Sequence, residues 1–197
     1  AACTGTPLAI DLSTIATSLG FRSASINSYD SVSDRDFILE ALQANALLAT
    51  HLSRFCEDMM FESSSAISLF KLSPNWSTGS SIMPNKRNPD IPELVRAKCA
   101  RIIGAANEGL NLVRVVAHSY GSDLHELKRT FLTSVGELLS CLNALVPFTS
   151  ELSVNTNRAE KLLACGHLLA TEIADALTNS GLPFRDAYKI VGTLVAK

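Results

Sequence analysis

Aromatic residues, excess charge and closely spaced cysteines are scarce in this 197-residue chain, and each scarcity removes a class of protein. The formal net charge is −2, so no basic field is present to attract nucleic acid or an anionic membrane. The five cysteines are odd in number, lie far apart and form no Cys-x-x-Cys pair. This spacing argues against a zinc or disulfide framework and favours a reducing cytoplasm. No run of about 18 apolar residues occurs, so a transmembrane helix is not expected.

Alternating strand patterns are also lacking, whereas helical periodicity recurs along the chain. Apolar residues at steps of three and four predict a long helix over about 34–61, where Ser33 and Asp36 have the spacing of a capping box. The stripe of this helix comprises Phe37, Ala41, Ala44, Leu48, Leu52, Phe55 and Met59. A second stripe comprises Ile91, Val95, Cys99, Ile102, Ala106, Leu110 and Val113. A third runs from Leu124 to Leu145, with Pro147 expected to end its helix.

A shorter pattern runs from Leu162 to Leu177 and stops at the Gly-Leu-Pro of 181–183, and a small helix near 8–19 is expected to end at Gly20. Helices as long as the first three are typical of a long bundle, which rarely buries all its apolar stripes within one chain. We therefore expect self-association, with a monomeric four-helix domain as the alternative. The way the chain begins and ends suggests a fragment of a longer polypeptide.

The stretch 77–89, STGSSIMPNKRNP, lies between two predicted long helices and carries no apolar period. Asn88 is a candidate N-cap, and Pro89 and Pro92 suit the first turn of the helix that follows. Free backbone N–H groups, the positive end of a helix and Lys86 together suit a carboxylate or a developing negative charge. From the residues alone, a solvated linker between helices is the alternative.

Several segments of the chain resemble one enzyme superfamily. Residues 79–93, GSSIMPNKRNPDIPE, closely resemble the GSSxMPxKxN signature of the fumarase/aspartase superfamily. Residues 27–37, NSYDSVSDRDF, resemble the NSMDAxS(D/E)RDF stretch of argininosuccinate lyases, and residues 50–58 resemble the next stretch of that family. Residues 182–192 resemble its C-terminal GVPFRxAHxxVG segment.

This resemblance implies an all-α fold. We expect a long-helix bundle of the fumarase/aspartase type over residues 1–150, without its N-terminal part. Residues 151–197 are expected to form the beginning of a small helical C-terminal domain.

By the same resemblance, Ser80 is the catalytic serine of a mobile loop and removes a proton from the carbon next to a carboxylate. Its alkoxide needs stabilisation, for which Lys86 and the loop N–H groups are candidates, and Lys86 also offsets the charge of the aci-carboxylate. Asn88 matches an asparagine that hydrogen-bonds a substrate carboxylate, and Glu93 matches a glutamate that pairs with a partner histidine. The alternatives are a solvent-facing Lys86, a helix-capping Asn88 and a Glu93 favoured only by the helix dipole.

A second stretch, YGSDLHELK at 120–128, resembles the family pattern Y-N-K-D-L-Q-E-D-K. The family uses the tyrosine, the glutamine and the last lysine to bind substrate, so the resemblance assigns substrate binding to Tyr120 and Lys128. His125 stands at the glutamine position and Ser122 at that of the first lysine. His125 can still donate or accept a hydrogen bond, but it differs in shape and can carry charge. The alternative for Lys128 is an ordinary surface lysine.

The His-x-His-x-Gln motif that holds the family's acid/base histidine does not occur in these 197 residues, nor does its Ser-x-Asn-Asp motif. In this superfamily, stretches from three subunits of a homotetramer combine in each active site. The resemblance thus implies that this chain supplies two such stretches and is inactive alone.

The activity implied is β-elimination of argininosuccinate to arginine and fumarate, in arginine biosynthesis or the urea cycle. No metal or cofactor, nucleic-acid partner or membrane is expected, and the location expected is cytoplasmic. The alternatives are an adenylosuccinate lyase-like enzyme and a non-catalytic relative of the crystallin kind.

Overall fold

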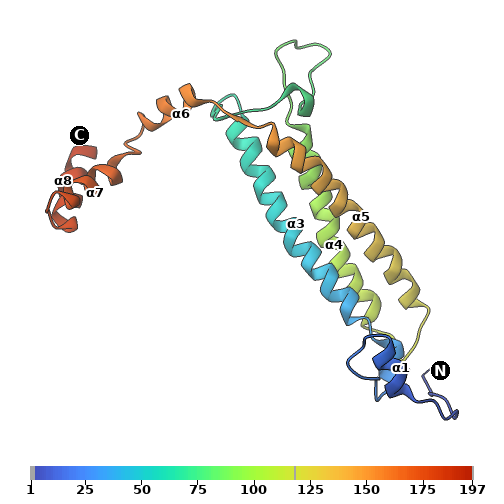
Figure 1. The fold of residues 1–197 in the computed structure, drawn as a ribbon. Coiled ribbons are helices and arrows are strands. Elements are labelled where there is room, and N and C mark those ends of the chain that lie inside the picture. Colours follow the sequence, from blue (N-terminus) through green and yellow to red (C-terminus); the bar gives the residue numbers. More distant parts are fainter. Residues whose placement is uncertain (1–2, 118, 197) are drawn as a thin grey trace. The chain divides into compact units, whose positions relative to one another are not determined.

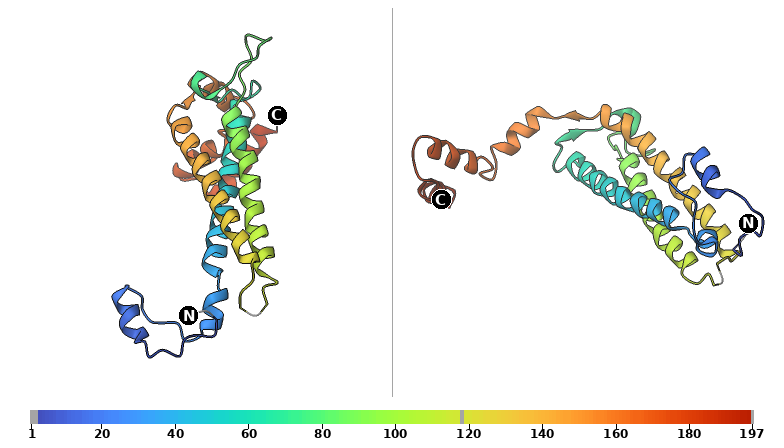
Figure 2. Two further views of the ribbon diagram at one scale, coloured as in Figure 1. Left: turned by 90° about the vertical axis from the view of Figure 1, so that its right-hand side faces the viewer. Right: turned by 60° about the horizontal axis from the view of Figure 1, so that its bottom comes forward.

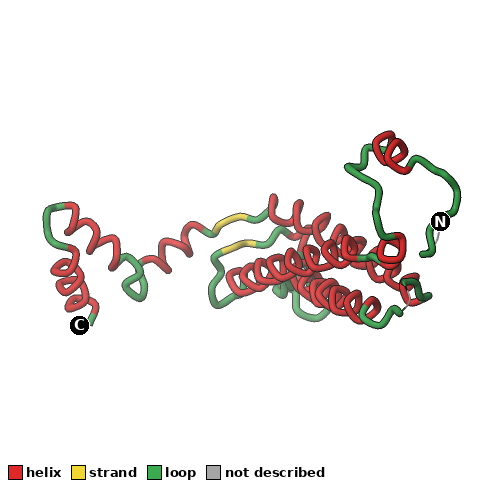
Figure 3. Tube along the Cα trace, turned by 90° about the horizontal axis from the view of Figure 1, so that it is seen from below, coloured by secondary structure: helices red, strands yellow, loops and turns green. Residues whose placement is uncertain are grey.

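Nearly all regular structure in the chain is helical (Figure 3). The structure, a computed structural model, describes residues 3–117 and 119–196. The expected all-α class is confirmed. The elements, in chain order, are α1 Leu12–Ser18, α2 Ser28–Ser33, α3 Asp36–Ser63, β1 Phe70–Lys71, a 3₁₀ turn Pro74–Trp76, α4 Asp90–Val113, α5 Asp123–Ser150, β2 Ser153–Val154, α6 Thr156–Leu163, α7 Ala170–Asn179 and α8 Phe184–Val195.

Contacts within the chain divide it into two compact units. The first unit joins residues 1–58 to residues 90–148, and the second joins residues 59–89 to residues 149–197. The segment between α3 and α4 therefore groups with the C-terminal helices. The domain boundary expected at residue 150 stays a prediction.

The first unit is built on α3, α4 and α5, which run side by side in all views (Figures 1 and 2). Each helix contributes one residue to a buried cluster of Leu42, Ala106 and Leu127. Next to this cluster α4 carries Gly109, where an added Cβ would lie 2.7 Å from Cδ1 of Leu42. The absence of a side chain at Gly109 thus lets α3 and α4 approach each other closely.

The buried face of α3 differs from the predicted stripe. The fully buried positions are Leu42, Ala49 and Cys56, at a spacing of seven residues, whereas of the predicted stripe only Met59 is buried and Phe37 is 65% exposed. The reason is that α3 carries apolar residues on two faces, and periodicity alone does not say which face meets α4 and α5. For α4 the prediction is largely confirmed, because Val95, Cys99, Ile102 and Ala106 are buried.

Three sequence predictions about helix ends are wrong. Pro147 does not end α5, which continues to Ser150. The side chain of Asp34, not a Ser33 capping box, accepts a hydrogen bond from the N–H of Asp36 at 2.9 Å. The pattern 162–177 is split into α6 and α7, because Gly166 and His167 adopt left-handed backbone angles.

Three of the five free cysteines lie in the bundle core, one on each long helix. Burial raises the pKa of Cys56 to about 12 and that of Cys99 to about 11, and also raises the pKa of Cys141. Neutral thiols of this kind pack as small apolar groups.

Polar side chains fix how α4 and α5 are aligned. Glu137 of α5 pairs with Lys98 and with Arg101 of α4, the latter at 3.2 Å. Further along, the hydroxyl of Thr130 donates to Oε1 of Glu108 at 3.0 Å. Because residue 137 lies opposite 98–101 and residue 130 lies opposite 108, the two helices are antiparallel with a defined register.

In the second unit, β1 and β2 form one antiparallel pair in which Phe70 lies opposite Val154. Arg158 of α6 reinforces this connection, because its guanidinium donates to the carbonyls of Ile67 and Ala66, each at 2.8 Å. Farther along the chain, α7 and α8 form a helical hairpin around the buried residues Ala174, Ala187 and Val191.

By length and composition, α5 could also cross a membrane, which the search for unbroken apolar runs did not indicate. This observation is weak evidence, since a core helix of a soluble protein has the same composition. Here the apolar content of α5 includes the face that packs on α3 and α4, with Leu127, Leu138 and Leu145 buried.

We predict opposite stability effects of alanine at two glycines of α4. Gly109→Ala lowers the free energy of unfolding, because the new methyl group collides with Leu42 in a packed core. Gly104→Ala, where nothing lies within 4 Å of an added Cβ, raises it by up to about 1 kcal/mol through helix propensity. Urea unfolding of both variants measures the difference, and equal effects would contradict the close approach of α3 and α4.

We also predict a pH-dependent contribution from Glu137. The hydrogen bond from Lys98, followed by the interaction with Arg101, holds the pKa of Glu137 below its ordinary value. A carboxyl group with a lowered folded-state pKa stabilises the fold above the ordinary value of about 4.3, and this contribution is lost as the pH falls through the folded-state pKa. Glu137→Gln is therefore less stable than the parent protein at pH 7.

The difference between Glu137→Gln and the parent protein should shrink towards pH 3 in urea unfolding. Glu160→Gln, at an exposed glutamate of α6, serves as the control and should show no such convergence. A Glu137→Gln effect of the same size at both pH values would exclude the ion pair as its cause.

Candidate functional site

The loop between the 3₁₀ turn and α4 is closed at its base by backbone hydrogen bonds. Thr78 and Asn88 form an antiparallel bridge, with the N–H of Asn88 donating to the carbonyl of Thr78 at 2.8 Å and the reverse bond at 3.2 Å. Asn88 is therefore not the N-cap of α4 as predicted, because it is held in the bridge and Pro89 stands between it and Asp90, the first helical residue.

Ser80 lies inside this closed loop. Its hydroxyl oxygen accepts hydrogen bonds from the backbone N–H groups of Ile82, at 3.2 Å, and Met83, at 3.1 Å. Two N–H donors aimed at one oxygen stabilise negative charge on that oxygen, as they do in an oxyanion hole. The arrangement supplies part of the stabilisation that an alkoxide at Ser80 requires.

Lys86 lines a cavity of about 530 Å³ within the second unit. Lys71 and Arg87 line the same cavity, together with three consecutive serines at the end of α3, Ser63–Ser65. Lys86 is exposed, so its ammonium can be offered to a ligand or to solvent.

Glu93 lies in the first turn of α4, on its exposed side. An acidic residue at this position interacts favourably with the helix dipole, which is the structural role weighed in the sequence analysis. Its exposure also leaves the carboxylate available to a histidine from another chain.

Tyr120 and His125 are brought together just before and inside the first turn of α5. The Tyr120 hydroxyl is hydrogen-bonded to Nε2 of His125, and the two rings meet edge to face with centroids 5.9 Å apart. Lys128 lines the same pocket, of about 280 Å³. The three substrate-binding residues predicted in this stretch therefore share one pocket.

Arg35 also lines this pocket, although it is not among the site residues predicted from the sequence. Arg35 belongs to the NSYDSVSDRDF segment, and the resemblance of this segment to argininosuccinate lyases is the sequence feature that could have marked Arg35 as a candidate. That its side chain faces a stretch about ninety positions later depends on tertiary structure, which periodicity does not give.

The register of α4 and α5 keeps the predicted site residues apart within one chain. Lys98 and Arg101 of α4 lie opposite Glu137 of α5. Because the two helices are antiparallel, Glu93 lies opposite a part of α5 that is closer to the C-terminus of α5 than Glu137 is. Lys128 lies in the opposite direction, so at 1.5 Å per residue roughly 20 Å of helix separates Lys128 from the level of Glu93. One chain alone therefore does not unite Glu93 with Tyr120, His125 and Lys128.

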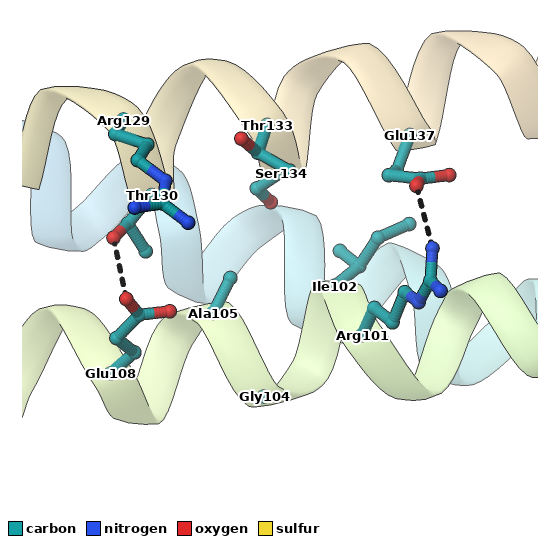
Figure 4. Close-up of a pocket in the computed structure, with 10 residues that line it drawn as sticks. All are labelled: Arg101, Ile102, Gly104, Ala105, Glu108, Arg129, Thr130, Thr133, Ser134 and Glu137. Carbon is teal, nitrogen blue, oxygen red and sulfur yellow. Dashed lines mark hydrogen bonds and ion pairs between the residues drawn. The ribbon is translucent and has the colours of Figure 1, made fainter.

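A groove of about 360 Å³ runs between α4 and α5 (Figure 4). Its ends carry the Glu137–Arg101 and Thr130–Glu108 interactions, and small residues such as Gly104 and Ala105 line its middle. None of the predicted site residues lies in this groove. Among residues 3–117 and 119–196, no group of three His, Cys, Asp or Glu side chains has the arrangement of a metal site.

Comparison with known families shows to which family this chain belongs. A family model described as "Lyase" matches residues 1–104, more than half of the chain. The chain belongs to the lyase family. A second family model, "Argininosuccinate lyase C-terminal", matches residues 167–197, so the C-terminal helices of this lyase resemble those of argininosuccinate lyases in particular.

The curated relatives of this chain include proteins named argininosuccinate lyase. The chain is 41% identical over 194 residues to the argininosuccinate lyase of Geobacter sp. (strain M21), covering 98% of this chain and 42% of the relative. With the argininosuccinate lyase of Lactococcus lactis subsp. cremoris it shares 43% identity over 195 residues, covering 99% of this chain and 42% of the relative. The chain thus spans about two fifths of the length of these relatives, and the family resemblance found in its motifs is confirmed.

Solved structures support the fold. An EDDS lyase crystallised with formate superposes with a TM-score of 0.81 at 24% identity, covering the whole chain and 39% of that structure. A class II fumarase from Schistosoma mansoni superposes with a TM-score of 0.70 at 22% identity, covering 89% of this chain and 35% of that structure. The expected long-helix bundle of the fumarase/aspartase type is confirmed.

Proposed function

We propose that this chain is part of an argininosuccinate lyase, which splits argininosuccinate into arginine and fumarate. The observation that carries the proposal is the identity of about 40% to curated argininosuccinate lyases along nearly the whole chain. The C-terminal family match at 167–197 supports this choice over an adenylosuccinate lyase-like enzyme, because that match includes the Leu182–Ala187 segment.

In the proposed reaction, Ser80 removes the proton from the carbon next to a carboxylate of the succinyl group. The N–H groups of Ile82 and Met83 support the negative charge that Ser80 must carry to act as a base. Lys86 offsets the charge of the aci-carboxylate that forms, and Asn88 binds substrate carboxylate. The electron pair then forms the double bond of fumarate as the carbon–nitrogen bond breaks.

Completing the proposed site requires a segment outside these residues as well as more than one subunit. The acid for the departing nitrogen is the histidine that Glu93 pairs with, and its motif is absent from these residues. The separation of Glu93 from Tyr120, His125 and Lys128 supports a composite site in a homotetramer. Exposed apolar side chains on α4 and α5, among them Ile103, Leu110, Leu132 and Leu139, suit helix packing between such copies.

The proposed enzyme is cytoplasmic and forms its site from protein groups alone. The five free cysteines are compatible with a reducing compartment. Of the alternatives, a crystallin-like relative without activity is favoured only by the departures at Ser122 and His125. The retained Ser80, Lys86 and Asn88 favour an enzyme instead.

The function is tested by adding argininosuccinate to the complete protein that contains this chain and following fumarate by its absorbance. We expect turnover of argininosuccinate and none of adenylosuccinate. The 197-residue chain alone should be inactive, since it lacks the acid/base histidine motif. Preferential turnover of adenylosuccinate would overturn the proposed substrate. Clear activity of the isolated chain would overturn the proposal that it is inactive alone.

Replacing Ser80 by alanine in the complete protein should lower kcat by about 10²- to 10⁴-fold, the usual contribution of a general base. Ser81→Ala, at the neighbouring hydroxyl, is the matched control and should retain most of the activity. Near-normal turnover by Ser80→Ala, with folding verified by circular dichroism, would show that another group is the base.

A further inference from the structure

The pocket beside the first turns of α5 combines positive charge with an apolar surface. Arg35, Tyr120, His125 and Lys128 provide its polar groups, and Ile38 and Leu124 belong to its apolar lining. It has no carboxylate among its lining residues, all of which are described. Two cations in a lining without a carboxylate favour an anionic group, and the apolar lining favours an aliphatic chain next to that group.

The guanidinium of Arg35 is held in place before any ligand arrives. Its Nη1 donates to the carbonyl of Asp34 at 2.6 Å and to that of Val32 at 3.2 Å. Both of these bonds use the same nitrogen, which leaves Nε and Nη2 to form a two-pronged contact with a carboxylate. An arginine anchored in this way loses little conformational entropy on binding.

The pair formed by Tyr120 and His125 restricts what can enter beside these cations. Their hydrogen bond and edge-to-face contact fix both rings relative to each other at the pocket. A ligand end that joins one carboxylate to an aliphatic arm uses both the cations and the apolar lining of the pocket, whereas a dicarboxylate would leave the apolar lining unused.

We propose that Arg35 is a further substrate-binding residue, which together with Lys128 binds the carboxylate at the amino-acid end of argininosuccinate, while the α-ammonium beside that carboxylate donates to the hydroxyl oxygen of Tyr120. The aliphatic arm that carries this carboxylate lies against Ile38 and Leu124. This inference rests on the proposed function, and it separates the recognition of the arginine moiety, at this pocket, from the chemistry on the succinyl moiety, at the Ser80 loop.

The test uses the complete protein and three variants. Arg35→Gln removes the charge, Arg35→Lys keeps it without the fork, and Arg114→Gln is a control. Arg114 lies just beyond the C-terminus of α4, outside the pocket, where its Nε donates to Asn111. The measurements are kcat, KM, inhibition by each product, calorimetric titration with arginine, and the thermal unfolding midpoint.

We expect Arg35→Gln to raise KM and the inhibition constant of arginine at least about tenfold, with kcat little changed, because uniform binding is lost. Inhibition by fumarate should stay nearly constant, Arg35→Lys should be intermediate, and Arg114→Gln should match the parent protein. A weaker inhibition by fumarate instead would assign the pocket to the succinyl end and overturn the inference.

A purely structural role of Arg35, through the carbonyls of Val32 and Asp34, gives a different result. It lowers the unfolding midpoint of Arg35→Gln while the inhibition constant of arginine stays at the parent value, which would also overturn the inference. Failure of the proposed function is seen separately, as a parent protein that does not turn over argininosuccinate. The titration with arginine, which needs no turnover, still decides the role of Arg35 in that case.

Discussion

The antiparallel register of α4 and α5 is the constraint on which the arrangement of the candidate site depends. It is set at one level by Glu137 with Lys98 and Arg101, and at another by Thr130 with Glu108. Because both helices are long and rigid, this register directs the first turn of α4 and the first turn of α5 to opposite ends of the bundle. A chain built in this way presents two sets of candidate functional groups at separate ends of the bundle.

The sequence predicted the class of fold and the positions of the long helices, because their apolar periodicity is strong and long. It did not predict which face of α3 is buried, since Phe37 and Leu48 continue one apolar stripe while Leu42, Ala49 and Cys56 form another. The ambiguity arises because α3 carries apolar residues on more than one face, and periodicity does not say which face packs on α4 and α5. Pro147 was misread because a proline near the end of a helix costs local hydrogen bonding that tertiary packing, here at Phe148, can offset.

The candidate site shows a similar division between local and tertiary information. The Ser80 loop can be predicted from the amino-acid sequence alone, because its motif is specific and its residues are contiguous in the chain. Its internal geometry cannot be predicted in this way, and the bridge between Thr78 and Asn88 replaced the expected helix cap. Sequence patterns do not indicate Arg35, because it shares a pocket with Tyr120 and Lys128 only after α3 and α5 have packed.

The departure from the family pattern at His125 is best understood together with Arg35. A glutamine at this position offers a flexible amide with both a donor and an acceptor, whereas His125 commits one ring nitrogen to the hydroxyl of Tyr120. Fewer donors then remain at this position for a carboxylate. In the proposed substrate complex, Arg35 and Lys128 offset this loss, because a two-pronged guanidinium contact would supply the missing hydrogen bonds. The substitution is thus compatible with substrate binding for as long as the anchored guanidinium of Arg35 remains in place.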